Sequence, residues 1–168
     1  PTLTILRSVA FALMLIVGLA ARPAFAFDTS AEFGILVDAE TGAVLWEKDA
    51  ETQMHPASMS KLMTLTMLFE ALKAGTAKLD DEFPISEHAW RAGGAASGSS
   101  TMFAQLGTSI PVEVLIQGII VQSGNDACIA VAEALNGSEP EFAAAMTRRG
   151  KELGLTNSTF ANSTGWPD

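Results

Sequence analysis

The sequence is poor in the residues that build cross-links, metal sites and surfaces for polyanions. Cys128 is the only cysteine, so no disulfide can form within the chain. One cysteine and two histidines also argue against a zinc ion held by the protein. Lys and Arg number 10 against 19 Asp and Glu, for a net charge of −9, and there is no basic run. Nucleic acid is therefore excluded as an expected partner.

Apolar residues are abundant and make up 48% of the 168 residues, against 17% that are charged. This composition indicates one globular domain with a real core. Cys128 lies in the apolar helical run NDACIAVAEAL. We interpret it as a small buried hydrophobe and not as a reactive thiol.

The first 26 residues have the pattern of a secretory signal peptide. Arg7 precedes an apolar run from Val9 to Ala21, and Ala24-Phe25-Ala26 has the small-x-small pattern of a signal-peptidase site. A membrane anchor is the alternative, but a spanning helix needs roughly 20 apolar residues, and this run is shorter. We expect export with cleavage after Ala26. Cleavage removes two Arg and no acid, so 8 basic and 19 acidic residues leave a net charge of −11.

The mature chain is predicted to begin with a β-hairpin and to continue as a mostly helical block. The hairpin strands are 33–37 and 44–47, around turn residues 40–42. Because two strands alone make a marginal sheet, we expect further strands beyond Asp168 and an α/β (α+β) fold. The predicted helical runs are 58–75 ended by Gly75, 109–124 with Pro111 in its first turn, 123–137, 138–154 behind the capping-box pair Ser138 and Glu141, and a short helix capped by Ser86.

Ser58 and Lys61 stand three residues apart at the start of the first helical run. The plain interpretation is a helix N-cap and a surface lysine, because one Ser-x-x-Lys arises by chance about 0.4 times in such a chain. The alternative is a nucleophile and its base, on one helix face at the positive end of the helix dipole, whose N–H groups can stabilise an oxyanion. The uncharged run LMTLTMLF follows Lys61, and burial there would lower the pKa of the amine and make it a usable base.

Ser123-Gly124-Asn125 lies at the junction of two predicted helices. A helix break explains this tripeptide, and a chance match is again common. The same break can point polar side chains into a cleft, where a hydroxyl relays a proton and an amide holds a substrate carbonyl. We therefore expect the Ser58 hydroxyl and the Lys61 amine within hydrogen-bond reach, with the Ser123 side chain facing the same cleft.

Four other polar or aromatic residues are possible members of the site. His55 is interpreted as a loop residue, because sequence neighbours of a serine rarely have triad geometry. His88 and Trp90 either line the cleft or belong to a short helix packed by Trp90. Asp126 is interpreted as a charge at a helix N-terminus, and 162–167 as a turn.

Three motifs follow one another along the mature chain: PASMSKLMT at 56–64, SGNDA at 123–127 and FANSTGWPD at 160–168. With the hairpin ILVDAETGAVLWEKDA and the loop SGSSTMF, this ordered set resembles the D-alanyl-D-alanine carboxypeptidase family, the low-molecular-mass penicillin-binding serine peptidases. The resemblance covers nearly the whole mature chain. It implies a serine β-lactamase/transpeptidase-like fold, in which residues 27–168 are the N-terminal part of the catalytic domain and the C-terminal sheet strands are missing.

The resemblance also implies a role for each motif residue. Ser58 would attack the carbonyl of the penultimate D-alanine, form an acyl-enzyme and release the terminal D-alanine. Lys61 would take the Ser58 proton, and Ser123 would pass a proton towards the leaving amine. Asn125 would hydrogen-bond the substrate or Lys61. Which group acts as the base in serine–lysine enzymes stays open. Water would then hydrolyse the acyl-enzyme, with no metal or organic cofactor.

The implied substrate is a peptidoglycan stem pentapeptide ending in D-Ala-D-Ala, with β-lactam antibiotics as inhibitors. The implied location is the periplasm or the outer face of the bacterial cytoplasmic membrane, and peripheral membrane attachment through a segment beyond Asp168 stays open. The third family motif, Lys-Thr-Gly, does not occur in these 168 residues. It would supply a substrate-carboxylate contact and an oxyanion donor, so we expect the 168-residue chain alone to be a poor or inactive enzyme.

Two other functions stay open. A serine β-lactamase-like hydrolase uses the same framework but adds a glutamate after the second motif to activate the deacylating water, and STFANSTGWPD offers none. A non-catalytic cell-wall- or penicillin-binding module would keep the fold alone. The presence of both serines, Lys61 and Asn125 argues against the loss of catalytic residues that such a module would show.

Overall fold

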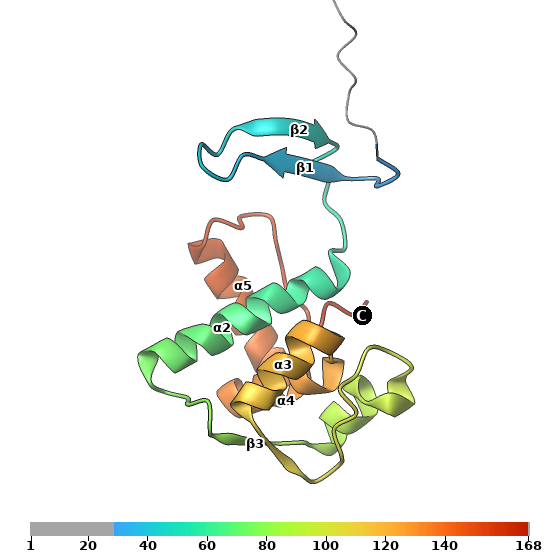
Figure 1. The fold of residues 1–168 in the computed structure, drawn as a ribbon, viewed down its shortest axis with the longest axis vertical. Coiled ribbons are helices and arrows are strands. Elements are labelled where there is room, and N and C mark those ends of the chain that lie inside the picture. The colour runs from blue at the N-terminus through green and yellow to red at the C-terminus, as the bar shows by residue number, and fades with distance from the viewer. Residues whose placement is uncertain (1–28, 168) are drawn as a thin grey trace, which may run out of the picture. The chain divides into compact units, whose positions relative to one another are not determined.

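The computed structural model describes residues 29–167, and the signal peptide predicted for residues 1–26 lies outside them. The chain divides into two compact units, one ending at Thr52 and the other beginning at Gln53 (Figure 1). The first unit carries a β-hairpin, and the second carries the helices and two further short strands.

The predicted hairpin is confirmed, with strands β1 (Gly34–Val37) and β2 (Val44–Lys48). The strands are antiparallel, with Leu36 opposite Trp46. The turn between them is held by Asp38, whose side chain accepts from the backbone N–H of Thr41 at 2.8 Å and from the Thr41 hydroxyl at 2.6 Å. Gly42 has φ +72°, a conformation that glycine adopts without steric cost, and this explains its place in the turn.

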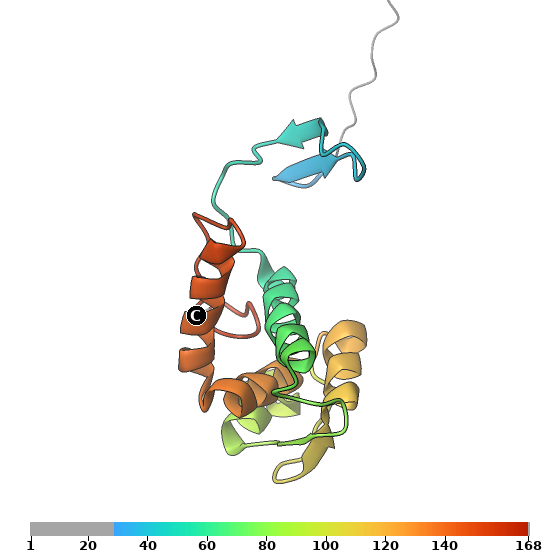
Figure 2. The same ribbon diagram turned by 90° about the vertical axis from the view of Figure 1, so that its left-hand side faces the viewer.

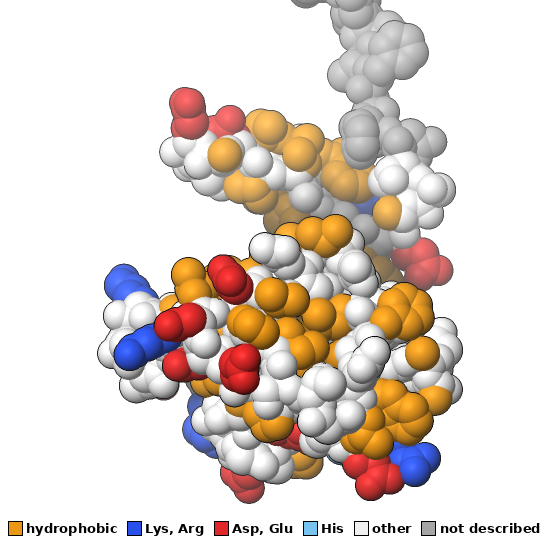
Figure 3. All heavy atoms as spheres, turned by 60° about the horizontal axis from the view of Figure 1, so that its bottom comes forward, with side chains coloured by type: hydrophobic (Ala, Val, Ile, Leu, Met, Phe, Trp, Pro, Cys, Tyr) orange, Lys and Arg blue, Asp and Glu red, His pale blue; other side chains and the backbone are white. Residues whose placement is uncertain are grey.

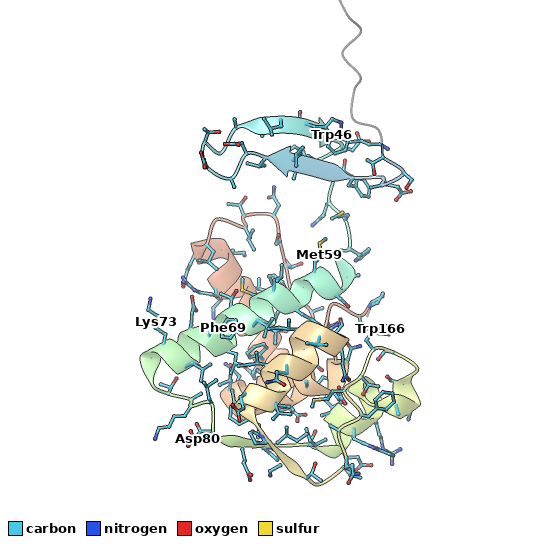
Figure 4. All side chains as sticks on the ribbon, in the orientation of Figure 1. Trp46, Met59, Phe69, Lys73, Asp80 and Trp166 are labelled. Carbon is cyan, nitrogen blue, oxygen red and sulfur yellow. The ribbon has the colours of Figure 1, made fainter. Side chains whose placement is uncertain are left out.

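Helix α2 (Lys61–Ala74) begins with a tighter turn than the sequence indicated. Residues Ala57–Ser60 form the 3₁₀ turn η1, and the α-helix starts only at Lys61. The predicted stop is confirmed, because Gly75 is left-handed with φ +74° and closes the helix. Figure 4 shows Met59 at the N-terminal end of this helix and Lys73 near its other end.

Two short strands, β3 (Glu82–Pro84) and β4 (Ser109–Pro111), pair antiparallel and were not predicted. Three residues are too few to show a strand alternation in the sequence. Pro111 ends β4 and precedes α3 (Val112–Gln122), so its predicted place in the first helical turn was one residue off. The short helix predicted after Ser86 is present as the π-helical segment η2 (Ala89–Gly93), and Ser86 Oγ accepts from the Ala89 N–H at 2.9 Å.

Helix α4 (Asn125–Asn136) is the central element of the helical unit, and its residues from Asn125 to Ala132 are all buried. It contacts α2, α3, η2 and α5 (Glu139–Glu152). In Figure 2, α2 (green) lies between α5 (orange-red) and α3 (yellow). The predicted cap of α5 is present, since Ser138 Oγ accepts from the Glu141 N–H at 3.3 Å.

Cys128 is fully buried on α4, within the main apolar cluster. Burial raises the pKa of its thiol to about 12. The thiol therefore stays protonated and unreactive at neutral pH, which confirms its interpretation as a small core residue.

The helical unit also leaves large hydrophobic side chains at its surface, and Figure 3 shows hydrophobic side chains gathered on one face. The exposed ones on α2 and α3 include Leu62, Phe69, Ile120 and Val121. Surfaces of this kind are commonly places of contact with further protein. Within residues 29–167, no helix has both the length and the apolar character needed to cross a bilayer.

Candidate active site

Ser58 lies in the 3₁₀ turn that leads into α2, and its side chain does not cap the helix. The N-cap position of α2 is Ser60, and neither η1 nor α2 has a side-chain cap bond. Ser58 is exposed, and its hydroxyl oxygen accepts a 2.8 Å hydrogen bond from Lys61 Nζ. The N-cap interpretation of Ser58 is therefore wrong, because its hydroxyl is directed to Lys61.

Lys61 is the first residue of α2, and only 4% of its surface is exposed. Its Nζ donates to Ser58 Oγ and, at 3.2 Å, to Ser123 Oγ. Among the described residues, no carboxylate forms an ion pair with this amine. Burial lowers the pKa of Lys61 below its ordinary value of 10.5, because a desolvated ammonium is disfavoured. The expected partial burial of this lysine is confirmed.

Ser123 reaches Lys61 because it lies in the short connection between the end of α3 and the start of α4. It is the C-cap of α3 and has the left-handed φ of +55°. The Gly124 N–H returns to the Gly118 carbonyl at 3.0 Å, and α4 then begins at Asn125. The predicted helix break is present. It brings together two hydroxyls and one amine from segments 62 residues apart in the chain.

Asn125 lies beside this group but binds elsewhere. It is 3% exposed, and its side-chain Nδ2 donates to Ser99 Oγ at 3.0 Å. Its backbone N–H donates to the Ser100 carbonyl at 2.8 Å. Within residues 29–167 its amide oxygen has no hydrogen-bond partner, and no hydrogen bond joins Asn125 to Lys61. The Asn125 side chain is therefore held by Ser99 and not by Lys61.

Asp126 lies in the first turn of α4, as predicted for a charge at a helix N-terminus, but a loop distant in the chain also binds it. It is fully buried, whereas a simple helix N-terminal charge would be solvated. Its carboxylate accepts from the Thr101 hydroxyl at 2.7 Å, the Met102 N–H at 2.9 Å and the Ala104 N–H at 3.0 Å. An acid in the first turn of a helix looks the same in a sequence whether it is solvated or buried, so no local signal marked this contact.

The turn at 162–165 packs against Ala57 and Ser60, the residues on either side of the Ser58-Met59 pair. Asn162 Oδ1 accepts from the Thr164 N–H at 3.1 Å and the Gly165 N–H at 2.8 Å, which confirms the predicted turn. Gly165 has φ +74°, and a Cβ on it would overlap with the Ala57 carbonyl oxygen. Ala57 itself has the uncommon φ of +49°. The sequence did not indicate that this turn would contact the backbone preceding Ser58.

If Ser58 is the nucleophile that the motifs predict, Gly165→Ala is expected to slow its acylation at least about tenfold, because the new methyl group must displace the Ala57 carbonyl and with it Ser58. Gly154→Ala is the matched control. Gly154 also has a positive φ, +94°, but a Cβ there would meet open space. Both substitutions place an alanine at a positive φ and share that conformational cost. The two variants differ in the steric clash with Ala57, which precedes Ser58. Equal acylation rates in the two variants would contradict this account of the turn.

The histidine candidates do not join the Ser58 group. His55 is exposed in the chain before η1. His88 Nε2 lies 2.9 Å from Glu139 Oε2, and Trp90 packs against the apolar core. The structure therefore favours the short packed helix over a cleft-lining role for His88 and Trp90. Within residues 29–167, no three His, Cys, Asp or Glu side chains come together in a way that could hold a metal ion.

The sequence model of the peptidase S11 family of D-alanyl-D-alanine carboxypeptidases matches residues 19–168. The chain belongs to this family. Among curated D-alanyl-D-alanine carboxypeptidases, it is 42% identical over 135 residues to DacF of Bacillus subtilis (strain 168), covering 80% of this chain and 33% of that protein. It is 45% identical over 127 residues to DacC of Escherichia coli (strain K12), covering 75% of this chain and 32% of that protein.

Solved structures of D-alanyl-D-alanine carboxypeptidases and penicillin-binding proteins have the same fold. Penicillin-binding protein 5 from Haemophilus influenzae superposes with a TM-score of 0.80 at 34% identity, over 86% of this chain and 42% of that one. The D-alanyl-D-alanine carboxypeptidase DacD from Francisella tularensis gives a TM-score of 0.77 at 34% identity, over 90% of this chain and 36% of that one. The expected transpeptidase-like fold is confirmed. The chain spans about a third of the length of the curated D-alanyl-D-alanine carboxypeptidases it matches.

Proposed function

We propose that this protein is a serine-type D-alanyl-D-alanine carboxypeptidase that removes the terminal D-alanine from peptidoglycan stem pentapeptides through an acyl-enzyme on Ser58. One observation carries the proposal: a buried lysine amine, with no acidic partner among the described residues, donates to the hydroxyls of both Ser58 and Ser123. This arrangement supplies a nucleophile, an amine of lowered pKa and a second hydroxyl within hydrogen-bond reach.

Acylation begins when Ser58 Oγ attacks the carbonyl carbon of the penultimate D-alanine. As the new C–O bond forms, the Ser58 proton moves to the neutral amine of Lys61, which is 2.8 Å away. The carbonyl oxygen becomes an oxyanion. Ser58 lies in η1, at the N-terminal end of α2 and so at the positive end of the helix dipole, and this end of the helix favours the negative charge.

Collapse of this intermediate breaks the C–N bond, and the leaving amine takes up a proton. Lys61 holds the proton and is 3.2 Å from Ser123 Oγ, so the Ser123 hydroxyl is the relay to the amine nitrogen. D-alanine leaves, and Ser58 remains as an ester. Water then attacks the ester carbonyl, the acyl C–O bond breaks, and Ser58 regains its proton. Lys61, now neutral again, can accept the proton of that water.

Family membership and the N-terminal pattern support a proposal for the substrate and the location. The curated relatives are named D-alanyl-D-alanine carboxypeptidases, and the structural neighbours include penicillin-binding proteins. We therefore propose that the protein is exported by the signal at 1–26, acts on D-Ala-D-Ala termini outside the cytoplasmic membrane, and is acylated by β-lactams. Slow loss of the β-lactam label is expected, since a carboxypeptidase lacks the glutamate with which β-lactamases activate the deacylating water.

The hydrogen bonds of Glu139, an acid that contacts the turn at 162–165, support the peptidase over a β-lactamase. Glu139 Oε1 accepts from the Ser163 N–H at 3.0 Å and from the Ser163 hydroxyl at 2.6 Å, and Glu139 Oε2 pairs with His88. Both of its oxygens are thus engaged in holding the turn. A general base for water needs an unengaged carboxylate oxygen within reach of the ester.

The test of the proposal is the reaction of the full-length protein with a fluorescent penicillin and with a pentapeptide ending in D-Ala-D-Ala. We expect covalent labelling, slow loss of the label, and release of one D-alanine per peptide. Rapid loss of label with turnover of the penicillin would make the protein a β-lactamase. Labelling without D-alanine release would indicate a binding module. The absence of both labelling and D-alanine release would refute the proposal.

The rate of acylation is expected to rise with pH through the pKa of Lys61. The base must be neutral, and burial places the Lys61 pKa below 10.5, so its neutral form becomes abundant at a lower pH than for a solvated lysine. Below that pKa the amine is protonated and cannot accept the Ser58 proton. The measurement is the labelling rate by fluorescent penicillin from acidic to alkaline pH, corrected for spontaneous β-lactam hydrolysis. A rate that falls as the pH rises would contradict Lys61 as the base.

A further inference from the structure

Asp126 carries a buried charge that the proposed mechanism does not use. Its carboxylate is fully buried and accepts hydrogen bonds from three groups of one loop segment, the Thr101 hydroxyl and the N–H groups of Met102 and Ala104. The N–H of Ala127, in the first turn of α4, lies 3.0 Å from Asp126 Oδ1. A buried carboxylate is stable only when it is paired or fully hydrogen-bonded, and these four donors meet that need.

The loop segment 99–104 approaches Asp126 because two glycines leave room for it. A Cβ on Gly118 would lie 2.7 Å from Met102 Sδ, and a Cβ on Gly124 would lie 3.1 Å from the Met102 nitrogen and 3.0 Å from Asp126 Oδ1. Met102 therefore lies against the break between α3 and α4, the same break that presents Ser123 to Lys61. The loop and the break form one packed unit.

The same loop segment holds Asn125, the neighbour of Asp126. Ser99 Oγ accepts from Asn125 Nδ2 at 3.0 Å, and the Ser100 carbonyl accepts from the Asn125 N–H at 2.8 Å. A second hydroxyl supports Ser99, since Ser97 Oγ lies 2.6 Å from Ser99 Oγ. Because its nitrogen donates to Ser99, the Asn125 amide is held in one orientation.

We propose that Asp126 is a positioning residue: it clamps the loop segment 99–104, and the clamped loop fixes the Asn125 amide for its contact with the substrate. The inference rests on the proposed function, in which Asn125 binds the substrate. Asp126 itself touches no reacting atom. It acts through Thr101, Met102 and Ala104 on the loop, and through the loop on Asn125.

The carboxylate is required because every group facing it is a donor. Replacing Asp126 with Asn puts an NH₂ group where an oxygen now accepts from N–H and O–H groups, so at least one donor loses its partner. The shape of the side chain is otherwise kept. Asp126→Asn in the full-length protein is therefore expected to release the loop without leaving a cavity.

The test measures acylation by a fluorescent penicillin, and kcat and KM for D-alanine release, in a double-mutant cycle with Asn125→Ala. We expect Asp126→Asn to lower the acylation rate at least about tenfold, and to have little further effect when Asn125 is already alanine. We also expect Asp126→Asn to raise the KM for D-alanine release by more than a variant that only loses stability does. Val131→Ala, a fully buried truncation on the same helix, is the control and should leave both constants unchanged.

A second pair of variants decides the matter if Asp126→Asn fails to fold. Thr101→Val removes one donor to Asp126 and should lower acylation, whereas Thr101→Ser keeps the hydroxyl and should restore it. Unchanged acylation in Asp126→Asn, or an equal loss with and without Asn125, would overturn the inference, as would equal behaviour of the two Thr101 variants. Absence of labelling in the wild-type protein would refute the proposed function, and the inference would fall with it.

Discussion

Ser58→Ala in the full-length protein is expected to abolish both covalent labelling by a fluorescent penicillin and release of D-alanine from a D-Ala-D-Ala pentapeptide. The hydroxyl that Lys61 contacts at 2.8 Å is the only atom from which the acyl-enzyme can form in the proposed mechanism. Without it the covalent route disappears, rather than slowing by a fixed factor. The variant should fold, because Ser58 is exposed and does not cap α2.

Ser138→Ala is the matched control for this experiment. Ser138 does cap a helix, since its hydroxyl accepts from the Glu141 N–H. Its loss is expected to lower the free energy of unfolding by about 0.5–2 kcal/mol and to leave labelling intact. The two variants thus separate a structural serine from a chemical one. D-alanine release by the Ser58 variant at close to the wild-type rate would show that another group is the nucleophile.

Lys61→Met is expected to lower the rate of acylation by about 10²–10⁴, the usual contribution of a positioned base. Methionine keeps the apolar stem in its buried place but has no amine to accept the Ser58 proton. Because burial of the Lys61 amine is unfavourable, the melting temperature should stay unchanged or rise. A variant that loses activity while keeping its stability assigns the lysine to chemistry. The measurements are labelling rate and thermal unfolding on the same samples.

Lys73→Met provides the control on the same helix. Lys73 is exposed in the last turn of α2, far along the helix from Met59 (Figure 4). Its replacement should leave labelling within about twofold of wild type, since it contacts neither serine of the group. If Lys61→Met were acylated as fast as Lys73→Met, the base would have to be another group. Ser123 and its hydrogen-bond partners would then be the next to test.

Most of the local structure could be predicted from the sequence, because it depends on neighbouring residues. The hairpin follows from β-prone runs around Asp38 and Gly42, and the helix ends follow from Gly75 and Ser138. Two short strands were missed because three residues show no periodicity. The start of α2 was misplaced because a 3₁₀ turn and an α-helix bring residues three apart to nearly the same face.

The contact between Ser58 and Lys61 is the part of the candidate site that the sequence by itself determined. Side chains three residues apart at a helix start must lie on one face, whatever the rest of the chain does. The apolar run after Lys61 likewise made its burial and lowered pKa predictable. The ordered motifs then predicted the family, which the match over residues 19–168 shows.

The predicted helix break led us to expect Ser123 beside this pair, but only the tertiary structure decided how that contact and the other long-range contacts are made. The Ser123 hydroxyl reaches Lys61 across 62 residues, and the Asp126 carboxylate reaches a loop 22–25 residues before it. Gly165 packs behind Ala57 from the far end of the chain. These contacts depend on how α2, α3 and α4 pack, and packing is set by the fit of whole apolar surfaces. A residue's type and neighbours do not encode that fit, so Asp126 gave no local sign of being a buried clamp instead of a solvated charge.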